Sequence, residues 1–266
     1  MNRMPSLFVS HGAPTFAIEP AQAGPLLRQL GRELPRPKAV LVFSPHWMTP
    51  GVRVSSTATP ETVHDFGGFP AELYRIQYPA PGSPEVAARA IELLKAAGWD
   101  ASEDPQRGLD HGAWVPVRHL FPNADVPVLQ VSMSRDLDAA GAVRLGRALA
   151  PLADEGVLLL GSGSITHNLY EFRQDIGAAG ASYAAEFVGW ARAALQRHDE
   201  AGLVDYLAVA PHAQRAHPTP DHYLPLPFAF GASAPDAPVR VLDGGMTYGM
   251  LAMDSYLFGE AQGAQA

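Results

Sequence analysis

The chain has 266 residues, a formal net charge of −8 at pH 7 and no cysteine. Apolar residues make up 47% and charged residues 17%, a balance typical of a globular protein and unlike that of a disordered chain. Nucleic acids and anionic membranes bind clustered Lys and Arg, so we expect neither as a partner. Without thiolates, any bound metal is expected to use nitrogen and oxygen ligands, mainly from histidine.

A chain of this length fits one large α/β domain or two small ones. We favour one domain over residues 1–260, with a frayed tail at residues 261–266. The N-terminal residues show no charged region followed by a long apolar one, and no apolar run reaches 18 residues. We therefore expect a cytoplasmic protein, either a monomer or a small homo-oligomer.

The N-terminal part predicts alternating strands and helices. Residues 5–10 and 39–47 are apolar runs typical of strands that are buried on both faces of a parallel sheet. Between them, leucines at helical spacing in residues 19–34 predict a helix, which gives a βαβ unit with a right-handed crossover. A strand at residues 52–56 and a helix at residues 84–97 follow.

The middle of the chain continues this pattern. Residues 126–133 and 157–160 are further buried-strand candidates. Residues 136–152 and 182–196 predict helices, the second with Ser182 as its N-cap.

The C-terminal part predicts shorter elements. Pro220 and Asp221 suit the start of a helix with His222 in its first turn. Residues 239–242 predict a last strand and residues 247–258 a closing helix. The predicted fold is therefore α/β, a single domain with a mostly parallel central sheet flanked by helices.

Histidines occur where the predicted strands end. His11, His46 and His167 each follow a buried-strand run. Ligands of open parallel sheets bind beyond the carboxyl ends of the strands, so His11 and His46 are well placed to share one metal, with His167 at the same edge. His111 and His222 lie in Gly- or Pro-rich segments, which is a weaker indication.

The other histidines have less context. His217 is ambiguous, because it lies only five residues before His222. Residues 64–68 include a Gly pair and predict a loop that shapes a pocket. Four histidines are expected to have no role in a site: His64, His119, His198 and His212.

Common catalytic motifs are missing from the sequence. The segment Gly161-Ser-Gly-Ser lacks the lysine of a phosphate-binding loop. The sequence contains no Gly-x-Ser-x-Gly and no His-Glu-x-x-His, which disfavours an α/β serine hydrolase and the common zinc proteases.

Five short motifs span nearly the whole chain in order: Ser10-His11-Gly12-Ala13-Pro14, Ser44-Pro45-His46-Trp47, Asp110-His111-Gly112-Ala113-Trp114, Gly163-Ser164-Ile165-Thr166-His167-Asn168-Leu169 and His217-Pro218-Thr219-Pro220-Asp221-His222-Tyr223-Leu224-Pro225-Leu226. In combination they resemble the class III extradiol ring-cleavage dioxygenases, and within them the 4,5-DOPA dioxygenase-like branch. Each motif alone would be weak, but the combination is highly specific.

The resemblance implies a set of site residues. His11, His46 and His222 correspond to metal ligands, and His167 and His111 to proton-transfer or substrate-contacting residues. Family members that cleave protocatechuate-type substrates complete their ligand set with Glu, whereas this chain offers His222. Three neutral imidazoles suit zinc as well as iron(II), so we expect one divalent metal, Fe(II) for turnover or Zn(II) as bound. His167 is an alternative fourth ligand.

The implied activity is the opening of a catechol ring, DOPA- or caffeate-like, with O2. A catechol must lose protons to chelate a metal, O2 needs an open coordination position, and histidine near its usual pKa can accept and return protons. Five aromatic residues are candidates for the pocket wall, although each is as readily explained as core: Trp47, Phe66, Phe69, Trp114 and Tyr223.

Two other classes of protein fit part of this pattern. Three imidazoles and a water also make a hydrolytic zinc site, so the main alternative is a zinc hydrolase or amidase using the same histidines. A non-catalytic metal-binding protein is the other. His111 and His167 argue against it, because metal binding alone requires neither.

Overall fold

The computed structural model describes residues 3–261. Of the predicted tail at residues 261–266, all but Ala261 lies outside the described residues. The strands are β1 Ser6–Ser10, β2 Ala39–Thr49, β3 Val52–Ser55, β4 Ala101–Asp104, β5 Val128–Ser134, β6 Val157–Gly163, β7 Val239–Leu242, β8 Met246–Thr247, β9 Leu251–Ala252 and β10 Ser255–Phe258.

Helices precede or follow most of these strands. The α-helices are α1 Ala23–Glu33, α2 Pro84–Ala96, α3 His111–Leu120, α4 Ala139–Leu149, α5 Pro151–Asp154, α6 Ser182–Gln196, α7 Glu200–Val204, α8 Tyr206–Val209, α9 Ala213–Ala216 and α10 Pro225–Ala232. Three short 3₁₀ helices are η1 Pro14–Ala17, η2 Leu73–Arg75 and η3 Leu169–Glu171.

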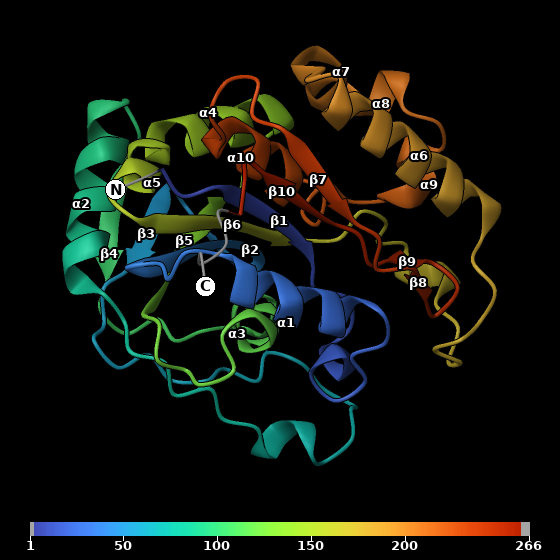
Figure 1. Cartoon of the computed structure of the whole chain (residues 1–266), viewed down its shortest axis with the longest axis horizontal. Helices are drawn as coiled ribbons and strands as arrows, with labels where there is room; N and C mark the ends of the chain where they lie inside the picture. The colour runs from blue at the N-terminus through green and yellow to red at the C-terminus, as the bar shows by residue number, and fades with distance from the viewer. Residues whose placement is uncertain (1–2, 262–266) are drawn as a thin grey trace.

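Within the described residues, eight strands form one sheet in the order β4-β3-β5-β2-β6-β1-β10-β7 (Figure 1). Strand β2 runs parallel to both β5 and β6, and β1 runs parallel to β6. The pairs that include β10 are antiparallel. The fold is therefore a single α/β domain with a mostly parallel sheet, as predicted, and the carboxyl ends of β5, β2, β6 and β1 meet at one edge.

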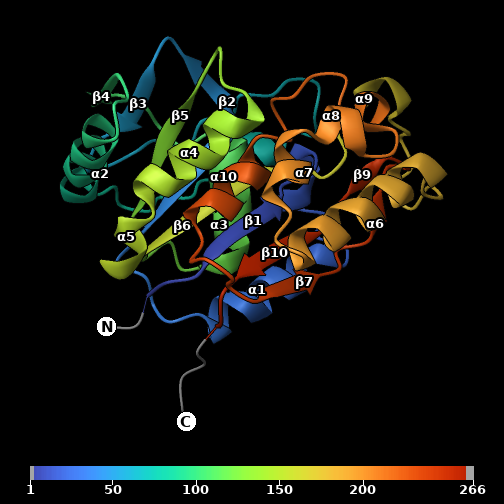
Figure 2. The ribbon, with the colours of Figure 1, turned by 90° about the horizontal axis from the view of Figure 1, so that it is seen from above.

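Each face of the sheet has its own hydrophobic core. Leu41 and Phe43 of β2 pack into one core and Val40 and Val42 into the other, because successive side chains of a strand point to opposite faces. Helices α4 and α10 cover the first face, and α1 and α3 cover the second (Figures 1 and 2). Burial on both faces explains why these strands are continuous apolar runs.

Several predicted helix limits need correction. The helix predicted for residues 136–152 is two helices, α4 and α5, with Pro151 opening the second, because proline cannot donate the backbone hydrogen bond that would continue the first. Ser83 caps α2 as an acceptor from the N–H of Val86. Ser182, by contrast, is the first residue of α6; the cap position is Ala181, without a side-chain hydrogen bond.

The closing helix predicted for residues 247–258 is wrong. These residues include the β8–β9 hairpin and strand β10, which lies between β1 and β7, so β7 is not the last strand either. Gly245 and Gly249 have positive φ values of +74° and +73°, which interrupt any helix. Tyr256 pairs with Phe8 of β1, and these sheet contacts outweigh the helical propensity of the segment.

No helix among residues 3–261 has the length and apolar character needed to cross a membrane.

Candidate metal centre

Three histidines from distant parts of the chain meet at the carboxyl edge of the sheet. His11 directly follows β1, His46 lies in β2, and His222 lies in a turn before α10. One ring nitrogen of each lies within 4.8 Å of the others, and Nε2 of His46 is 3.2 Å from Nε2 of His11. Two nitrogens bound to one zinc or iron ion would lie about 3–4 Å apart, so this spacing is compatible with one bound metal.

The Nδ1 atoms of His222 and His11 face groups that accept hydrogen bonds. Nδ1 of His222 is 2.6 Å from a carboxylate oxygen of Asp221. Nδ1 of His11 is 2.9 Å from Oγ of Ser162, whose hydroxyl donates its own proton to the carbonyl of Gly112, so Ser162 must accept from His11. Such partners set the tautomer and leave the lone pair on Nε2.

The tautomers of His11 and His222 leave an Nε2 lone pair on each of these two rings. Nε2 of His222 is buried and has no hydrogen-bond partner in the structure. His11 Nε2, also carrying a lone pair, faces Nε2 of His46. A buried polar atom without a partner, such as Nε2 of His222, costs free energy, so a cation between the rings is the arrangement that fits.

The electrostatic surroundings keep these rings neutral. Burial, followed by the charges of the neighbouring histidines, lowers the pKa of His11 well below its usual value. Burial, then the charge of His167, does the same for the pKa of His222, and burial and His111 lower the pKa of His46 to about 4. Neutral imidazole is the form that binds a metal, so the three rings need not lose protons to do so at pH 7.

His46 lies where the pairing of β2 with β5 is irregular. The pairing of β2 with β5 shifts register between Phe43 and Met48, and Pro45 lies in this stretch without a backbone N–H to donate. The predicted strand, residues 39–47, thus continues two residues further than expected, to Thr49.

The helix predicted to start at Pro220 and Asp221 does not form there. A turn carries His222 instead. Residues 221–224 form the turn and α10 begins only at Pro225. The carbonyl of His222 accepts a hydrogen bond from the N–H of Ser164 at 2.9 Å. This tertiary contact ties the turn to the end of β6 and uses a carbonyl that a helix would have needed.

His167 and His111 lie beside the three-histidine group. The ring of His167 stacks on that of His222, with centroids 3.4 Å apart and planes inclined by 6°. His111, the first residue of α3, has its ring centroid 4.0 Å from that of His46. Burial, followed by the charges of nearby groups, lowers the pKa of His167 to about 4.

Asp65 joins His111 to the rest of the site, a role that its sequence context indicated only weakly. Its carboxylate accepts from the backbone N–H of His111 at 2.8 Å and lies 2.9 Å from His111 Nδ1 and 3.6 Å from His46 Nδ1. Burial opposes ionisation, but the hydrogen bonds and charge of His111 lower the pKa of Asp65 to about 2. Asp65 therefore holds the imidazole of His111 as an Nδ1 donor and lies beside that of His46. Its position in the predicted Gly-containing loop was the available signal.

Asp110 fixes the start of α3. Its side chain caps the helix at the N–H of Ala113 and accepts from Ser44 of β2 and from Gln130 of β5. Arg107 donates to it at 2.8 Å. This buried network ties the end of β2, which carries His46, to the helix that carries His111.

The five histidines line a cavity of about 490 Å³, within the usual range of small-molecule sites. Its remaining wall is apolar: Gly12, Ala13, Pro14, Phe66, Gly67, Phe69, Leu169, Phe172 and Leu251. Of the five aromatic candidates, Phe66 and Phe69 line the cavity. Trp47, Trp114 and Tyr223 do not; Trp114 donates to the carbonyl of Val63, and Tyr223 to that of Leu203, both from buried positions.

The other histidines lie outside the cavity wall. His217 is buried and its Nε2 is 2.8 Å from the carbonyl of Ile165, a contact that supports the segment leading to His167. His119 contacts the carbonyl of Phe16, and His64 that of Ile76. His198 and His212 have positive φ values of +53° and +57° at helix ends.

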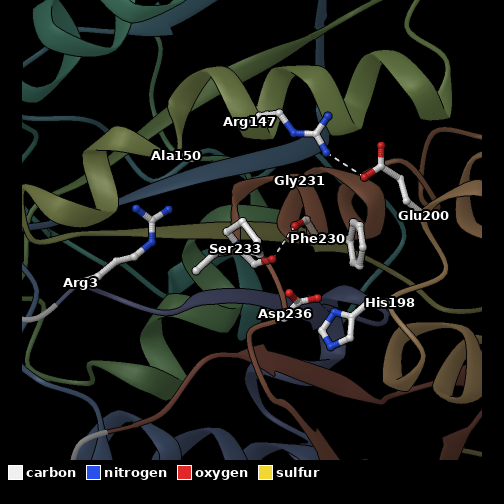
Figure 3. A pocket seen from close by; sticks show the side chains of 11 residues that line it. Arg3, Arg147, Ala150, His198, Glu200, Phe230, Gly231, Ser233 and Asp236 are labelled. Atoms are coloured by element: carbon white, nitrogen blue, oxygen red, sulfur yellow. Dashed lines mark hydrogen bonds and ion pairs between the residues drawn. The ribbon is translucent and has the colours of Figure 1, made fainter.

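A second hollow shares no lining residue with the histidine cavity (Figure 3). It lies between Arg3, which precedes β1, and the end of α10. Its charged side chains are largely paired: Arg147 contacts Glu200 at 2.7 Å, and Arg3 contacts Asp154. Figure 3 shows His198 and Asp236 at its border, without a cluster like that of the five histidines.

Gly163→Ala is expected to weaken metal binding about tenfold. An added Cβ would lie 2.3 Å from the carbonyl oxygen of His222, so the turn carrying His222 would have to move. Zinc titration against a competing chelator measures the change. Gly189→Ala in α6, where a Cβ meets nothing within 4 Å, is the matched control. Equal affinities in both variants would show that this close approach does not position His222.

The metal-free protein is expected to lose stability as the pH falls from 6.5 toward 4. Burial lowers the pKa of His119, His167 and His217 to about 4, whereas the unfolded chain titrates near 6.5. Between these values the unfolded state binds protons that the folded state cannot, at up to about 1.4 kcal/mol per pH unit for each histidine. Urea unfolding at pH 7.5, 6 and 5 measures this; a constant free energy of unfolding would contradict it.

One known protein family matches nearly the whole chain. A family model described as the catalytic LigB subunit of aromatic ring-opening dioxygenase matches residues 6–259. The chain therefore belongs to this family of ring-opening dioxygenases.

Individual relatives cover nearly the whole chain. A 4,5-DOPA dioxygenase extradiol of Beta vulgaris is 40% identical over 257 residues, covering 95% of this chain and 96% of that protein. One of Escherichia coli K12 is 38% identical over 260 residues, covering 97% and 95%. The crystal structure of an uncharacterized protein from Escherichia coli K12 superposes with a TM-score of 0.81 at 34% identity, covering 97% of this chain and 100% of that one.

Proposed function

We propose that the protein is a metal-dependent extradiol dioxygenase that opens the ring of a catechol, DOPA- or caffeate-like, with O2. The observation that carries the proposal is the convergence of one ring nitrogen each of His11, His46 and His222 in a cavity that also holds His111 and His167. Family membership and the names of the relatives support the reaction class. The catalytic domain is proposed to comprise residues 1–260.

The ligand residues are proposed to be His11, His46 and His222, of which His11 and His222 are held through Nδ1. A divalent ion bound there would supply a Lewis acid for a catechol and, if it were iron(II), a redox-active centre through which electrons could pass from the catechol to O2. Three imidazoles carry no negative charge, so they also suit zinc. We propose Fe(II) for turnover, with Zn(II) able to occupy the same ligands.

His111 and His167 are proposed to move protons. Because burial and neighbouring charges lower the pKa of His167 to about 4, it is neutral at pH 7 and can accept a proton. His111 donates through Nδ1 to Asp65, so its neutral form keeps a lone pair on Nε2 for a catechol proton. The Asp65 carboxylate then stabilises the protonated ring.

A zinc hydrolase or amidase remains the alternative, because its chemistry needs the same three imidazoles and a water. Relatives that are named dioxygenase favour the dioxygenase over the hydrolase. One of them, a dioxygenase of Hapsidospora irregularis, is 31% identical over 265 residues, covering 90% of this chain and 81% of that protein. We also propose a cytoplasmic location and a monomer or small homo-oligomer.

Metal exchange distinguishes the two reactions. The protein loaded with iron(II) under nitrogen and then exposed to air is expected to convert DOPA or caffeate to a yellow semialdehyde while consuming one O2 per ring opened. The zinc-loaded protein is expected to bind catechol without converting it, because zinc has no accessible redox change.

A hydrolase would give the reverse result. It would cleave amides or esters under nitrogen with zinc and would be indifferent to O2. No O2 uptake across a panel of catechols at verified iron occupancy would exclude the dioxygenase and leave the hydrolase as the better account of the histidines.

A further inference from the structure

We propose that Asp221 supplies a negative charge to the metal centre through His222, and that this charge sets how strongly the centre binds a metal and an anionic ligand. The charge acts in addition to the tautomer that Asp221 gives His222. Asp221 does not line the cavity, so it is a positioning residue that acts through a ligand. This role rests on the metal ligands proposed above, and it requires no ring opening.

The proposed ligands and the cavity wall leave the charge of a divalent ion unbalanced. Imidazole binds a metal in its neutral form, so His11, His46 and His222 bring no negative charge. Among the described residues that line the cavity, none is Asp or Glu. A cation in such surroundings loses hydration and is favoured by a nearby opposite charge. Within the protein, that charge has to lie behind one of the ligands.

Asp221 lies directly behind His222. Nδ1 of His222 donates to its carboxylate at 2.6 Å, whereas Nδ1 of His11 donates to the neutral hydroxyl of Ser162 at 2.9 Å. Nε2 of the His222 ring is buried and has no hydrogen-bond partner, which leaves it for the metal. A carboxylate bonded to the far nitrogen makes an imidazole a stronger donor. Among the described residues, no Lys or Arg pairs with Asp221, whose side chain is only 23% exposed.

Two other aspartates near the histidines are less suited to this role. Asp110 pairs with Arg107 at 2.8 Å, so its charge is already balanced. Asp65 accepts two hydrogen bonds from His111, which is not a proposed ligand, and lies 3.6 Å from Nδ1 of His46. The unbalanced charge in closest contact with a proposed ligand is therefore the carboxylate in the turn before α10.

A negative charge behind a ligand has opposite effects on two kinds of binding. It attracts a divalent cation and so raises the affinity for the metal. It repels an anionic ligand on the open side of the metal and so lowers the affinity for that ligand. A side chain that merely shaped the turn would change both affinities in the same direction, because a displaced His222 weakens the whole site. Opposed changes are therefore the signature of the charge.

Asp221→Asn separates the charge from the hydrogen bond, because the amide oxygen can still accept from Nδ1 of His222. Titration against a competing chelator should show a zinc affinity about tenfold below that of the parent. 4-Nitrocatechol binds a metal as an anion, and its absorbance reports the binding. The zinc-loaded variant should bind it about tenfold more tightly than the zinc-loaded parent does.

Two further variants complete the comparison. Asp136→Asn removes the same charge at an exposed position away from the cavity and should leave both affinities at the parent values. Asp221→Ala removes the acceptor as well as the charge and should lower the zinc affinity about 100-fold. If both affinities of Asp221→Asn fell, or if neither changed, the proposed role of the charge would be overturned.

The iron-loaded protein gives a readout that needs no catechol. Loss of the charge should weaken the binding of Fe(III) more than that of Fe(II), because the ion of higher charge is attracted more strongly. The Fe(III)/Fe(II) reduction potential of Asp221→Asn is expected to rise by about 59 mV for a tenfold difference between the two losses of affinity. An unchanged or lower potential would contradict the role of Asp221.

Failure of this role is distinguishable from failure of the proposed function. Zinc binding and the reduction potential need no turnover, so a protein that opened no catechol would still show the opposed changes. A parent without measurable zinc affinity, or a His222→Ala variant that kept the parent affinity, would reject the proposed ligands and the role of Asp221 together. If His222→Ala lost zinc but Asp221→Asn showed no opposed changes, the role of Asp221 alone would fail.

Discussion

His11→Ala, His46→Ala and His222→Ala are each expected to weaken metal binding by about 100-fold or more. Each change removes one of three neutral nitrogen donors whose atoms lie within 4.8 Å of one another. Two remaining imidazoles cannot hold a divalent ion against water as three can. Metal content after dialysis and zinc titration against a chelator measure the loss.

His167→Ala and His111→Ala are the controls for these ligand variants. They are expected to keep most of the metal and to lose turnover, because His167 stacks beside His222 and His111 donates to Asp65. If His167→Ala lost metal to the same extent as His222→Ala, His167 would have to be counted as a fourth ligand.

Asp65→Asn is expected to lower kcat by about 10- to 100-fold. The carboxylate accepts from two N–H groups of His111 and lies 3.6 Å from Nδ1 of His46. The amide of asparagine keeps the shape but offers one acceptor oxygen and no charge. The ring of His111 would then lose either its tautomer or the stabilisation of its protonated form.

A purely structural role of Asp65 would give a different pattern. We expect KM and the midpoint of urea unfolding to change little, while kcat falls and its dependence on pH alters. Asp136→Asn, at an exposed position away from the cavity, is the matched control. Equal kcat in the two variants and the parent would contradict the positioning role.

The three proposed metal ligands are far apart along the chain, so folding must bring them together. His11, His46 and His222 come together only when β1, β2 and the turn before α10 are in place. The unfolded chain therefore has no comparable site, and a metal bound to these residues stabilises the fold by mass action.

The apolar runs determined the sheet before any tertiary information was available. The predicted strands at residues 5–10, 39–47 and 157–160 correspond to β1, β2 and β6, because burial on both faces requires continuous apolar sequence. The same runs end in His11 and His46, and parallel pairing brings the carboxyl ends of such strands to one edge. This local pattern was sufficient to place those imidazoles together.

Tertiary pairing decided the structure where local preference was weak. Residues 247–258 have a helical pattern but form β8, β9 and β10, because β10 gains backbone partners on both sides from β1 and β7. Likewise, the hydrogen bond from Ser164 to the carbonyl of His222 selects a turn over a helix start. Strand β1 is far from β10 along the chain, and Ser164 is far from His222, so no local pattern indicates either contact.

The sequence alone determined which residue types are available for the chemistry: ten histidines, no cysteine, and a loop with adjacent His, Asp, Phe and Gly. Only the tertiary structure decided what each imidazole can do. Hydrogen bonds to Ser162, Asp221 and Asp65 set which nitrogen keeps its lone pair, and packing against Phe66 and Phe172 makes the cavity apolar. Tautomer and burial depend on atoms 2.6–3.6 Å away in space that lie as far as 151 residues away along the chain, which is why sequence spacing could not supply them.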